Sequence, residues 1–126
     1  MSVALAQRQC VPCRTGSPSL TDAQVSELIQ QVSGWAVVIH SGVPRLRRAF
    51  KFADYLTALA FVQNVGEMAE EQDHHPRVIV EWGRVEVEWW THIVNGLHMN
   101  DFIAAAKTDQ LYPATDQGAS LRQHKA

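Results

Sequence analysis

The fold follows from residues 54–90, DYLTALAFVQNVGEMAEEQDHHPRVIVEWGRVEVEWW, in which one long helical pattern runs directly into two strand patterns. Over residues 54–71 apolar side chains recur every three or four positions, and Asp54 suits a helix N-terminus. This spacing predicts a long amphipathic helix over residues 54–71. Its apolar stripe is expected to consist of Tyr55, Leu59, Val62, Val65 and Ala69.

The end of this stretch predicts a β-hairpin, because apolar side chains take alternate positions over residues 77–82 and 85–90, on either side of Gly83 and Arg84. The alternation is typical of a sheet with one buried face, and it places Glu86 and Glu88 on the other face. The side chains expected on the buried face are Val78, Val80, Trp82, Val85, Val87 and Trp89.

The chain before residue 54 shows the same order of a helix followed by a hairpin. Thr21 and Gln24 form a capping-box pattern at the start of a helix predicted over residues 21–32. Residues 35–40 and 45–52 flank a turn and predict a hairpin. The apolar stripe expected on the helix is Val25, Leu28, Ile29 and Val32.

The strand over residues 45–52 has a basic face that includes Arg45, Arg47 and Lys51. Such a face suits either solvent or nucleic acid. A net charge of −2 and the lack of aromatic residues on that face favour a solvated surface, so no nucleic-acid partner is expected.

A third helix is expected to begin near Asn100 and Asp101 and to end at Pro113, with Phe102 and Ile103 on its apolar side. The organisation is then an N-terminal arm (1–20), one domain (21–113) and a frayed tail (114–126). The domain is of the α+β class, with a four-stranded antiparallel sheet covered on one face by three helices, in the order α-β-β-α-β-β-α. A free sheet edge or an exposed helix face predicts a homodimer or homotetramer.

Composition sets outer limits on the function. The 126 residues are 46% hydrophobic and suit a single domain, and no apolar run approaches the roughly 20 residues that a membrane span needs. The start MSVALAQRQ does not resemble a secretory signal, so a cytoplasmic location without membrane contact is expected. Cys10 and Cys13 have the spacing of half a zinc site or of a redox pair, but no second half accompanies them, and two reduced thiols in the arm are the favoured interpretation.

Polar side chains converge where the long helix and the last strand end. His74 and His75 are neighbours directly before Pro76, and adjacent histidines cannot share one face of a helix or strand. They therefore suit the end of an element, where both rings can turn toward one cavity. An unperturbed imidazole, with a pKa of about 6.5, suits proton transfer near neutral pH. The side chains expected around this cavity are Glu70, His74, His75, Thr91, His92 and Asp101.

At this point the chain resembles the pterin-4a-carbinolamine dehydratases. Their motif is a polar residue, three intervening positions, a histidine, a second histidine or asparagine and a small residue or proline, followed at set distances by an aromatic residue, a histidine or tryptophan, and an aspartate. The residues that match it are Glu70, His74, His75, Pro76, Trp82, His92 and Asp101. The resemblance covers most of the chain, from about Cys10 through the segment NDFIAAAK.

The resemblance implies a hydro-lyase without a cofactor or metal, which removes water from 4a-hydroxytetrahydropterin and yields quinonoid dihydropterin for tetrahydropterin recycling after aromatic amino acid hydroxylation. It implies that His74 and His92 form an acid and base pair, with the order left open, and that His75 also belongs to the catalytic set. The residues implied to position or support the pterin are Glu70, Asp73, Thr91 and Asp101. Whether the pterin stacks on a tryptophan remains open. Trp82 and Trp89 are expected in the core, whereas Trp35 and Trp90 have no assigned position.

Two other functions remain open. Glu70 and the three histidines are of the types that bind zinc or iron, although adjacent histidines seldom reach one ion. Relatives of this fold also serve as dimerisation partners of a transcription factor or assist assembly of a carbon-fixing enzyme. The intact histidine motif favours catalysis over a purely non-catalytic partner role.

Overall fold

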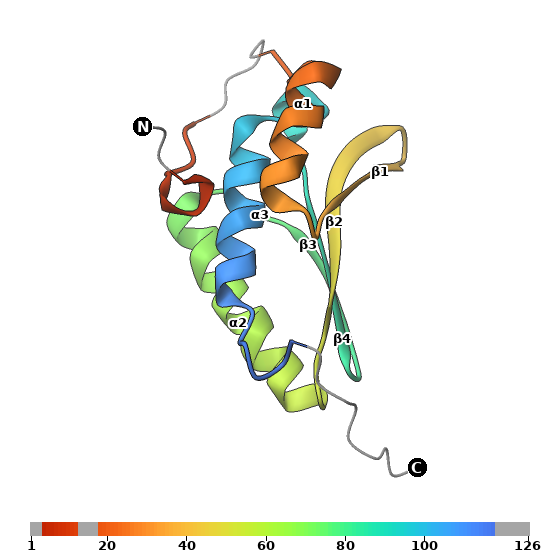
Figure 1. Cartoon of the computed structure of the whole chain (residues 1–126), viewed down its shortest axis with the longest axis vertical. Helices are drawn as coiled ribbons and strands as arrows, with labels where there is room; N and C mark the ends of the chain where they lie inside the picture. The colour runs from red at the N-terminus through yellow and green to blue at the C-terminus, as the bar shows by residue number, and fades with distance from the viewer. Residues whose placement is uncertain (1–3, 13–17, 118–126) are drawn as a thin grey trace.

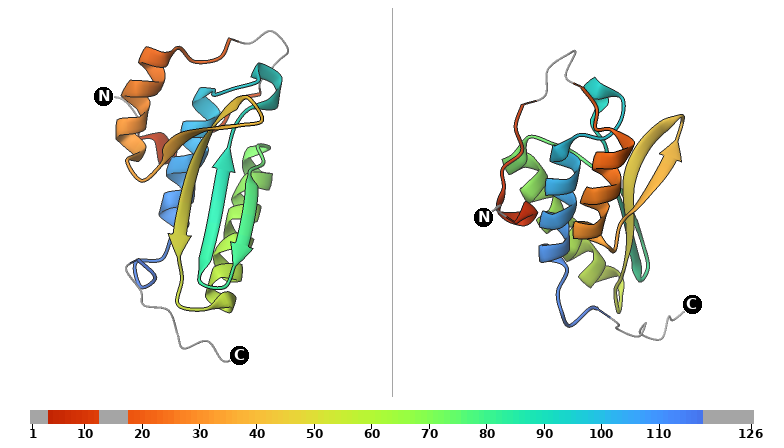
Figure 2. Two further views of the ribbon diagram at one scale, coloured as in Figure 1. Left: turned by 90° about the vertical axis from the view of Figure 1, so that its right-hand side faces the viewer. Right: turned by 45° about the horizontal axis from the view of Figure 1, so that its top comes forward.

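Two β-hairpins alternate with three α-helices in residues 4–12 and 18–117, the parts of the chain that this computed structural model describes (Figure 1). The strands form one antiparallel sheet in the order β1-β2-β4-β3, and the helices cover one of its faces (Figure 2). The expected α+β class and element order are confirmed. The elements are α1 (Asp22–Leu28), β1 (Ala36–His40), β2 (Val43–Lys51), α2 (Tyr55–Gln72), β3 (Arg77–Glu81), β4 (Arg84–Trp89) and α3 (Met99–Leu111), with 3-10 helices at Leu5–Gln7, Ile29–Val32 and His92–Val94.

Side-chain caps fix where the helices begin. The predicted capping box at the start of α1 is confirmed, since Thr21 Oγ1 accepts from the Gln24 amide and Gln24 Oε1 accepts from the Thr21 amide. Asp54 caps α2 by accepting the Thr57 amide at 2.9 Å. Helix α3 begins at Met99, slightly before the predicted start, because the ring of His98 acts as its cap. Histidine is not among the usual capping residues, so the sequence did not reveal this start.

Helix α2 packs on the sheet with a different stripe from the one predicted. Its buried residues are Ala58, Phe61, Val65, Met68 and Ala69, of which only Val65 and Ala69 were expected. Tyr55 and Leu59 are exposed instead, and Leu56 is 77% exposed. The helix carries apolar residues on more than one side, and spacing alone does not tell which side meets the sheet.

The inner face of the sheet forms the core with the helices. Phe50 of β2 is 1% exposed, and its ring centroid lies 4.8 Å from that of Phe61 and 4.9 Å from that of Tyr112. Trp89 is fully buried and donates through Nε1 to Thr108 at 3.1 Å. The prediction for Trp82 was wrong, because this residue lies beyond the end of β3 and is only half-buried.

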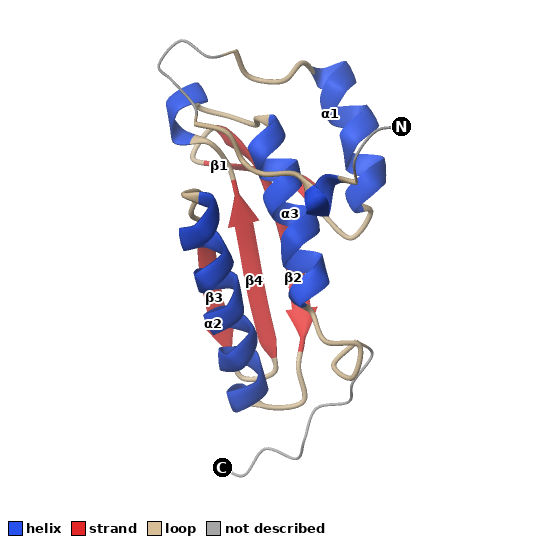
Figure 3. Cartoon of the chain, turned by 90° about the vertical axis from the view of Figure 1, so that its left-hand side faces the viewer, coloured by secondary structure: helices blue, strands red, loops and turns tan. Residues whose placement is uncertain are grey.

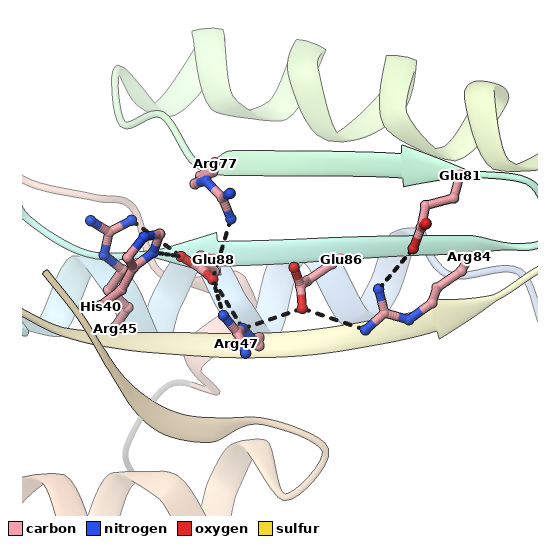
Figure 4. A network of polar contacts seen from close by, with 8 residues as sticks. All are labelled: His40, Arg45, Arg47, Arg77, Glu81, Arg84, Glu86 and Glu88. Carbon is pink, nitrogen blue, oxygen red and sulfur yellow. Dashed lines mark hydrogen bonds and ion pairs between the residues drawn. The ribbon is translucent and has the colours of Figure 1, made fainter.

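The outer face of the sheet is polar but not fully solvated, which corrects the interpretation of the basic strand. Glu86 and Glu88 lie there as predicted, yet Glu88 is fully buried beneath cationic side chains (Figure 4). Glu88 accepts from Arg45 Nη1 at 3.1 Å and from Arg47 Nη2 at 2.7 Å, and His40 Nδ1 lies 3.3 Å away. Four elements of the sheet are therefore connected through one carboxylate, since Arg77 of β3 also lies 3.5 Å from it.

The charge of Glu88 is stabilised by these partners. Burial raises the pKa of its carboxyl, but hydrogen bonds from Arg47, His40 and Arg45 and the charge of Arg47 outweigh burial and hold the pKa below its usual range. The hydrogen bond to Glu88 likewise raises the pKa of the Arg47 guanidinium.

Residues 4–12 of the N-terminal arm lie along the helical layer (Figure 3). Leu5 is buried, and Lys107 of α3 donates through Nζ to the Ala6 carbonyl at 2.8 Å. Cys13 and residues 118–126 of the predicted tail lie outside the described residues. None of the described helices is both long and apolar enough to cross a membrane.

Candidate active site

The end of α2 directs two histidines out of the helix. Asp73 has a left-handed backbone with φ of 50°, its amide donates to the Glu70 carbonyl, and the His74 amide donates to the Ala69 carbonyl at 3.1 Å. These paired bonds form a Schellman turn, which satisfies the last carbonyls of the helix and reverses the chain. Pro76 follows and prevents the helix from continuing. His74 and His75 consequently leave the helix together.

His74 is fixed by a buried carboxylate. Its Nε2 lies 2.7 Å from Oδ1 of Asp101, and its ring stacks on Trp89 with centroids 5.3 Å apart. Asp101 is fully buried, and its Oδ2 accepts from the Thr91 hydroxyl and from the His98 amide, each at 2.9 Å. An ionised carboxylate only accepts hydrogen bonds, so Nε2 of His74 carries a proton. In neutral His74, Nδ1 is then the nitrogen with a free lone pair.

His92 comes from the segment that follows β4. Thr91 and Gly96 form an antiparallel bridge, with the Thr91 amide donating to the Gly96 carbonyl at 2.9 Å, and this bridge closes the loop that carries His92. The ring of His92 meets that of Trp90 edge-on at 4.8 Å between centroids. The Arg45 guanidinium lies over the Trp90 indole, 3.6 Å from the ring centre. The indole therefore connects His92 to the polar cluster on the outer face of the sheet.

These side chains surround an open cavity of about 530 Å³. Five of the seven predicted site residues line it: His74, His75, His92, Asp73 and Thr91. Asp101 does not line the cavity and lies buried behind His74. Glu70 is also outside the lining, since its side chain is 81% exposed and lies 3.4 Å from Nε2 of His75.

Sequence reasoning missed the other walls of the cavity. Cys10, Val11 and Pro12 of the arm line it, together with Gln72 and Asn100. The arm is about 60 to 90 positions distant from these helices along the chain, and no periodic pattern signals such a contact. The CVPC segment was the one local signal, and it pointed to sulfur chemistry rather than to a wall.

The metal interpretation was tested on the same side chains. In residues 4–12 and 18–117, no three histidine, cysteine, aspartate or glutamate side chains are grouped as they would be to hold one ion. The three histidines and Glu70 thus do not form a common ligand set in this arrangement.

Comparison with known proteins places the chain in a family. A family model described as pterin 4 alpha carbinolamine dehydratase matches residues 18–111. The chain belongs to the pterin 4 alpha carbinolamine dehydratase family. A relative from Chlorobium luteolum is 48% identical over 108 residues, covering 86% of this chain and 95% of its own, and one from Microcystis aeruginosa is 46% identical over 108 residues, covering 86% and 93%. Both carry pterin-4-alpha-carbinolamine dehydratase as a provisional name.

Solved structures agree with the family. A transcriptional coactivator/pterin dehydratase from Brucella melitensis is 32% identical, with a TM-score of 0.69 over 75% of this chain and 99% of that one. A pterin dehydratase-like protein identified as a RuBisCO assembly factor in the alpha-carboxysome is 21% identical, with a TM-score of 0.53 over 63% and 89% of the two chains. The second likeness concerns the fold alone. Because the names of these two structures describe different roles, the site has to support any assignment of activity.

Proposed function

We propose that this protein is a cytoplasmic hydro-lyase that dehydrates 4a-hydroxytetrahydropterin to quinonoid dihydropterin, in the recycling of tetrahydropterin for aromatic amino acid hydroxylation. The observation that carries the proposal is the meeting of His74, His75 and His92 at one cavity, with His74 oriented by buried Asp101. Family membership supports a pterin as the substrate. The cavity volume lies within the range of about 300–1,000 Å³ that is typical of small-molecule sites.

The reaction needs one proton donor and one proton acceptor. The bond between ring carbon 4a and its hydroxyl oxygen breaks, and an imidazolium donates a proton so that the oxygen leaves as water rather than as hydroxide. The adjacent ring nitrogen loses its proton to a neutral imidazole as the carbon–nitrogen double bond forms. The protein therefore ends with the same number of protons, one moved from acid to base, and no electrons are exchanged.

His74 and His92 suit this pair of roles because they come from different elements and line the same cavity. His74 is held in one tautomer by Asp101, whereas His92 is exposed and contacts Trp90. Which of the two donates is left open. His75 completes the imidazole set.

The remaining predicted residues divide by position. Asp73 and Thr91 line the cavity and are proposed to contact the pterin. Asp101 acts through His74, and Glu70 acts through His75, so both are positioning residues rather than substrate contacts. Trp90 lines the cavity and is the tryptophan best placed to contact a flat heterocycle.

A stopped assay of 4a-hydroxytetrahydropterin dehydration tests this function. We expect His74→Ala and His92→Ala each to lower kcat by about 100-fold or more, the scale of general acid or base assistance. His40→Ala is the matched control, because it removes an imidazole that does not line the cavity. Wild-type rates in both cavity variants would end the proposed mechanism.

We also propose that the chain forms a homodimer or homotetramer, as the sequence predicted. The supporting observations are the exposed Leu56 and Leu59 on α2, and Val37 and Ile39 on the edge strand β1, of which Ile39 is 68% exposed. The same exposed residues favour the second candidate function, a non-catalytic dimerisation or assembly partner. Activity in the dehydration assay distinguishes the two.

A further inference from the structure

Asn100 holds the N-terminal arm by a reciprocal pair of hydrogen bonds. The Val11 amide donates to Asn100 Oδ1 at 2.9 Å, and Asn100 Nδ2 donates to the Val11 carbonyl at 2.6 Å. Asn100 is 3% exposed and lies in the first turn of α3, directly before Asp101. The same turn of α3 therefore positions both His74, through Asp101, and the arm, through Asn100.

The chemistry of this pair is specific. The amide and the carbonyl of one extended residue point to the same side, as in the paired residues of an antiparallel ladder. Val11 precedes Pro12, and a residue before proline favours extended backbone. A primary amide offers one donor and one acceptor in the matching geometry, so asparagine satisfies both groups at once.

A second anchor lies on α2. Gln72 Oε1 accepts from the Cys10 amide at 2.8 Å, and its Nε2 donates to Gln9 Oε1 at the same distance. Gln72 is the last residue of α2, immediately before the turn that releases His74. The arm is thus bound to both helices at the points where they contribute to the cavity.

We propose that residues 9–12 form a strap that is the specificity-determining wall of the pterin cavity, and that Asn100 is its positioning residue. Cys10, Val11 and Pro12 line the cavity but do not belong to the proposed acid and base pair, so the strap shapes binding rather than proton transfer. Its loss widens the cavity and removes contacts to the bound ring while His74 and His92 stay in place. This inference rests on the proposed dehydratase function for the identity of the ligand.

Two variants test the hydrogen bonds between Asn100 and the strap, one on each side of the contact. Asn100→Ala removes the side-chain amide, and Val11→Pro removes the amide hydrogen while leaving α3 unchanged. We expect Val11→Pro, which removes one of the two hydrogen bonds, to raise KM for 4a-hydroxytetrahydropterin by about tenfold, since roughly one net hydrogen bond corresponds to a factor of that size. Asn100→Ala removes both bonds and is expected to raise KM by at least as much. Each variant should change kcat by less than about threefold. The double variant is expected to resemble Asn100→Ala, because that substitution already breaks both hydrogen bonds. Asn64→Ala, at an exposed position of α2, is the matched control.

A thiol measurement reports the strap independently of turnover. Cys10 is half-buried, with Sγ 3.7 Å from the Asn100 carbonyl. In a Cys13→Ser background, iodoacetamide is expected to alkylate Cys10 at least about tenfold faster in Asn100→Ala than with Asn100 present, because the variant loses both hydrogen bonds to Val11 and each is worth roughly one factor of ten or less.

Each result has one meaning. Faster alkylation with unchanged KM would overturn the strap as a wall of the cavity, and unchanged alkylation would overturn Asn100 as its anchor. A fall in kcat without a rise in KM would assign Asn100 to the chemistry instead and overturn the proposal. A wild-type protein that dehydrates no carbinolamine, yet whose Cys10 is still shielded through Asn100, would refute the proposed function and the pterin wall but leave the anchoring by Asn100 standing.

Discussion

Nε2 of His74 and Oδ1 of Asp101 lie 2.7 Å apart, although His74 follows the end of α2 and Asp101 lies in the first turn of α3. The other oxygen of the same carboxylate accepts from Thr91 and from the amide of His98. One buried carboxylate therefore connects the end of α2, the segment after β4 and the start of α3. The orientation of His74 depends on this junction.

Asp101→Asn is expected to lower kcat on the order of 100-fold with little change in KM, because the asparagine amide donates toward Nε2 and favours the opposite tautomer of His74. Steady-state kinetics on the carbinolamine check this. Thr91→Val is the comparison, since it removes one donor to the carboxylate and leaves the bond to His74 intact, and we expect less than a tenfold loss there. An Asp101→Asn enzyme with the wild-type kcat would show that the tautomer of His74 does not matter.

Glu88→Gln is expected to destabilise the fold at pH 7 by about 1–3 kcal/mol, because it replaces a buried carboxylate that three arginines, Arg45, Arg47 and Arg77, contact. The folded-state pKa of Glu88 lies below its ordinary 4.5, so this stabilisation is present above pH 4.5 and is lost as the pH falls through the folded value. Urea unfolding at several pH values measures it. The gap in the free energy of unfolding between wild type and variant should narrow in acid.

Glu81→Gln serves as the control for Glu88. Glu81 forms an exposed ion pair with Arg84, 3.2 Å away, on the same face of the sheet. Exposed pairs contribute about 0–1 kcal/mol, so the stability of this variant should stay close to that of wild type at each pH. A gap for Glu88→Gln that is constant with pH would contradict the assigned pKa direction.

The contribution of Asp109 to stability should change with pH in the opposite direction to that of Glu88. Burial raises the pKa of its carboxyl above 3.8, despite hydrogen bonds from Trp35 and Arg48 and the charge of Arg48. A raised folded-state pKa means that the folded protein binds the proton more tightly, so this residue's contribution to stability falls as the pH rises from about 3.8 through the folded value. The free energy of unfolding of wild type minus that of Asp109→Asn should therefore be larger in acid than at neutral pH. The same difference in the free energy of unfolding at acid and at neutral pH would refute the raised pKa of Asp109.

Leu56→Glu is expected to shift the protein toward smaller species in sedimentation velocity, because it places a charge on the exposed apolar part of α2. Ser26→Glu, on the exposed surface of α1, is the control for added charge. A strict monomer for wild type at micromolar concentration would contradict the proposed oligomer.

Local signals in the sequence predicted most of the fold. The capping box of Thr21 and the two alternating hairpins depend on neighbours in the chain, and both were found as expected. The face that α2 presents to the sheet was predicted incorrectly, because several of its sides are apolar and only tertiary packing selects one. The burial of Glu88 was missed for a similar reason, since the arginines that cover it lie on β2 and β3.

The candidate site was predicted where it lies at the ends of elements. His74, His75 and His92 line one cavity because a helix end and a strand end meet there, which the predicted order of elements already implied. The contacts of Asn100 with Val11 span 89 positions and connect a helix to an irregular segment. No pattern of hydrophobicity or turn chemistry reports such a contact, so only the three-dimensional arrangement shows it.

The reversal at Asp73 uses main-chain atoms to aim two imidazoles. Asp73→Gly should preserve the trajectory, since glycine adopts this handedness without steric cost, and so separates what the carboxylate does from what the bend does. Any fraying of the last turn of α2 displaces both rings together. As the temperature rises, activity is therefore expected to be lost with the local opening of that turn and not with the unfolding of the whole domain. Amide hydrogen exchange at His74 would measure this local opening.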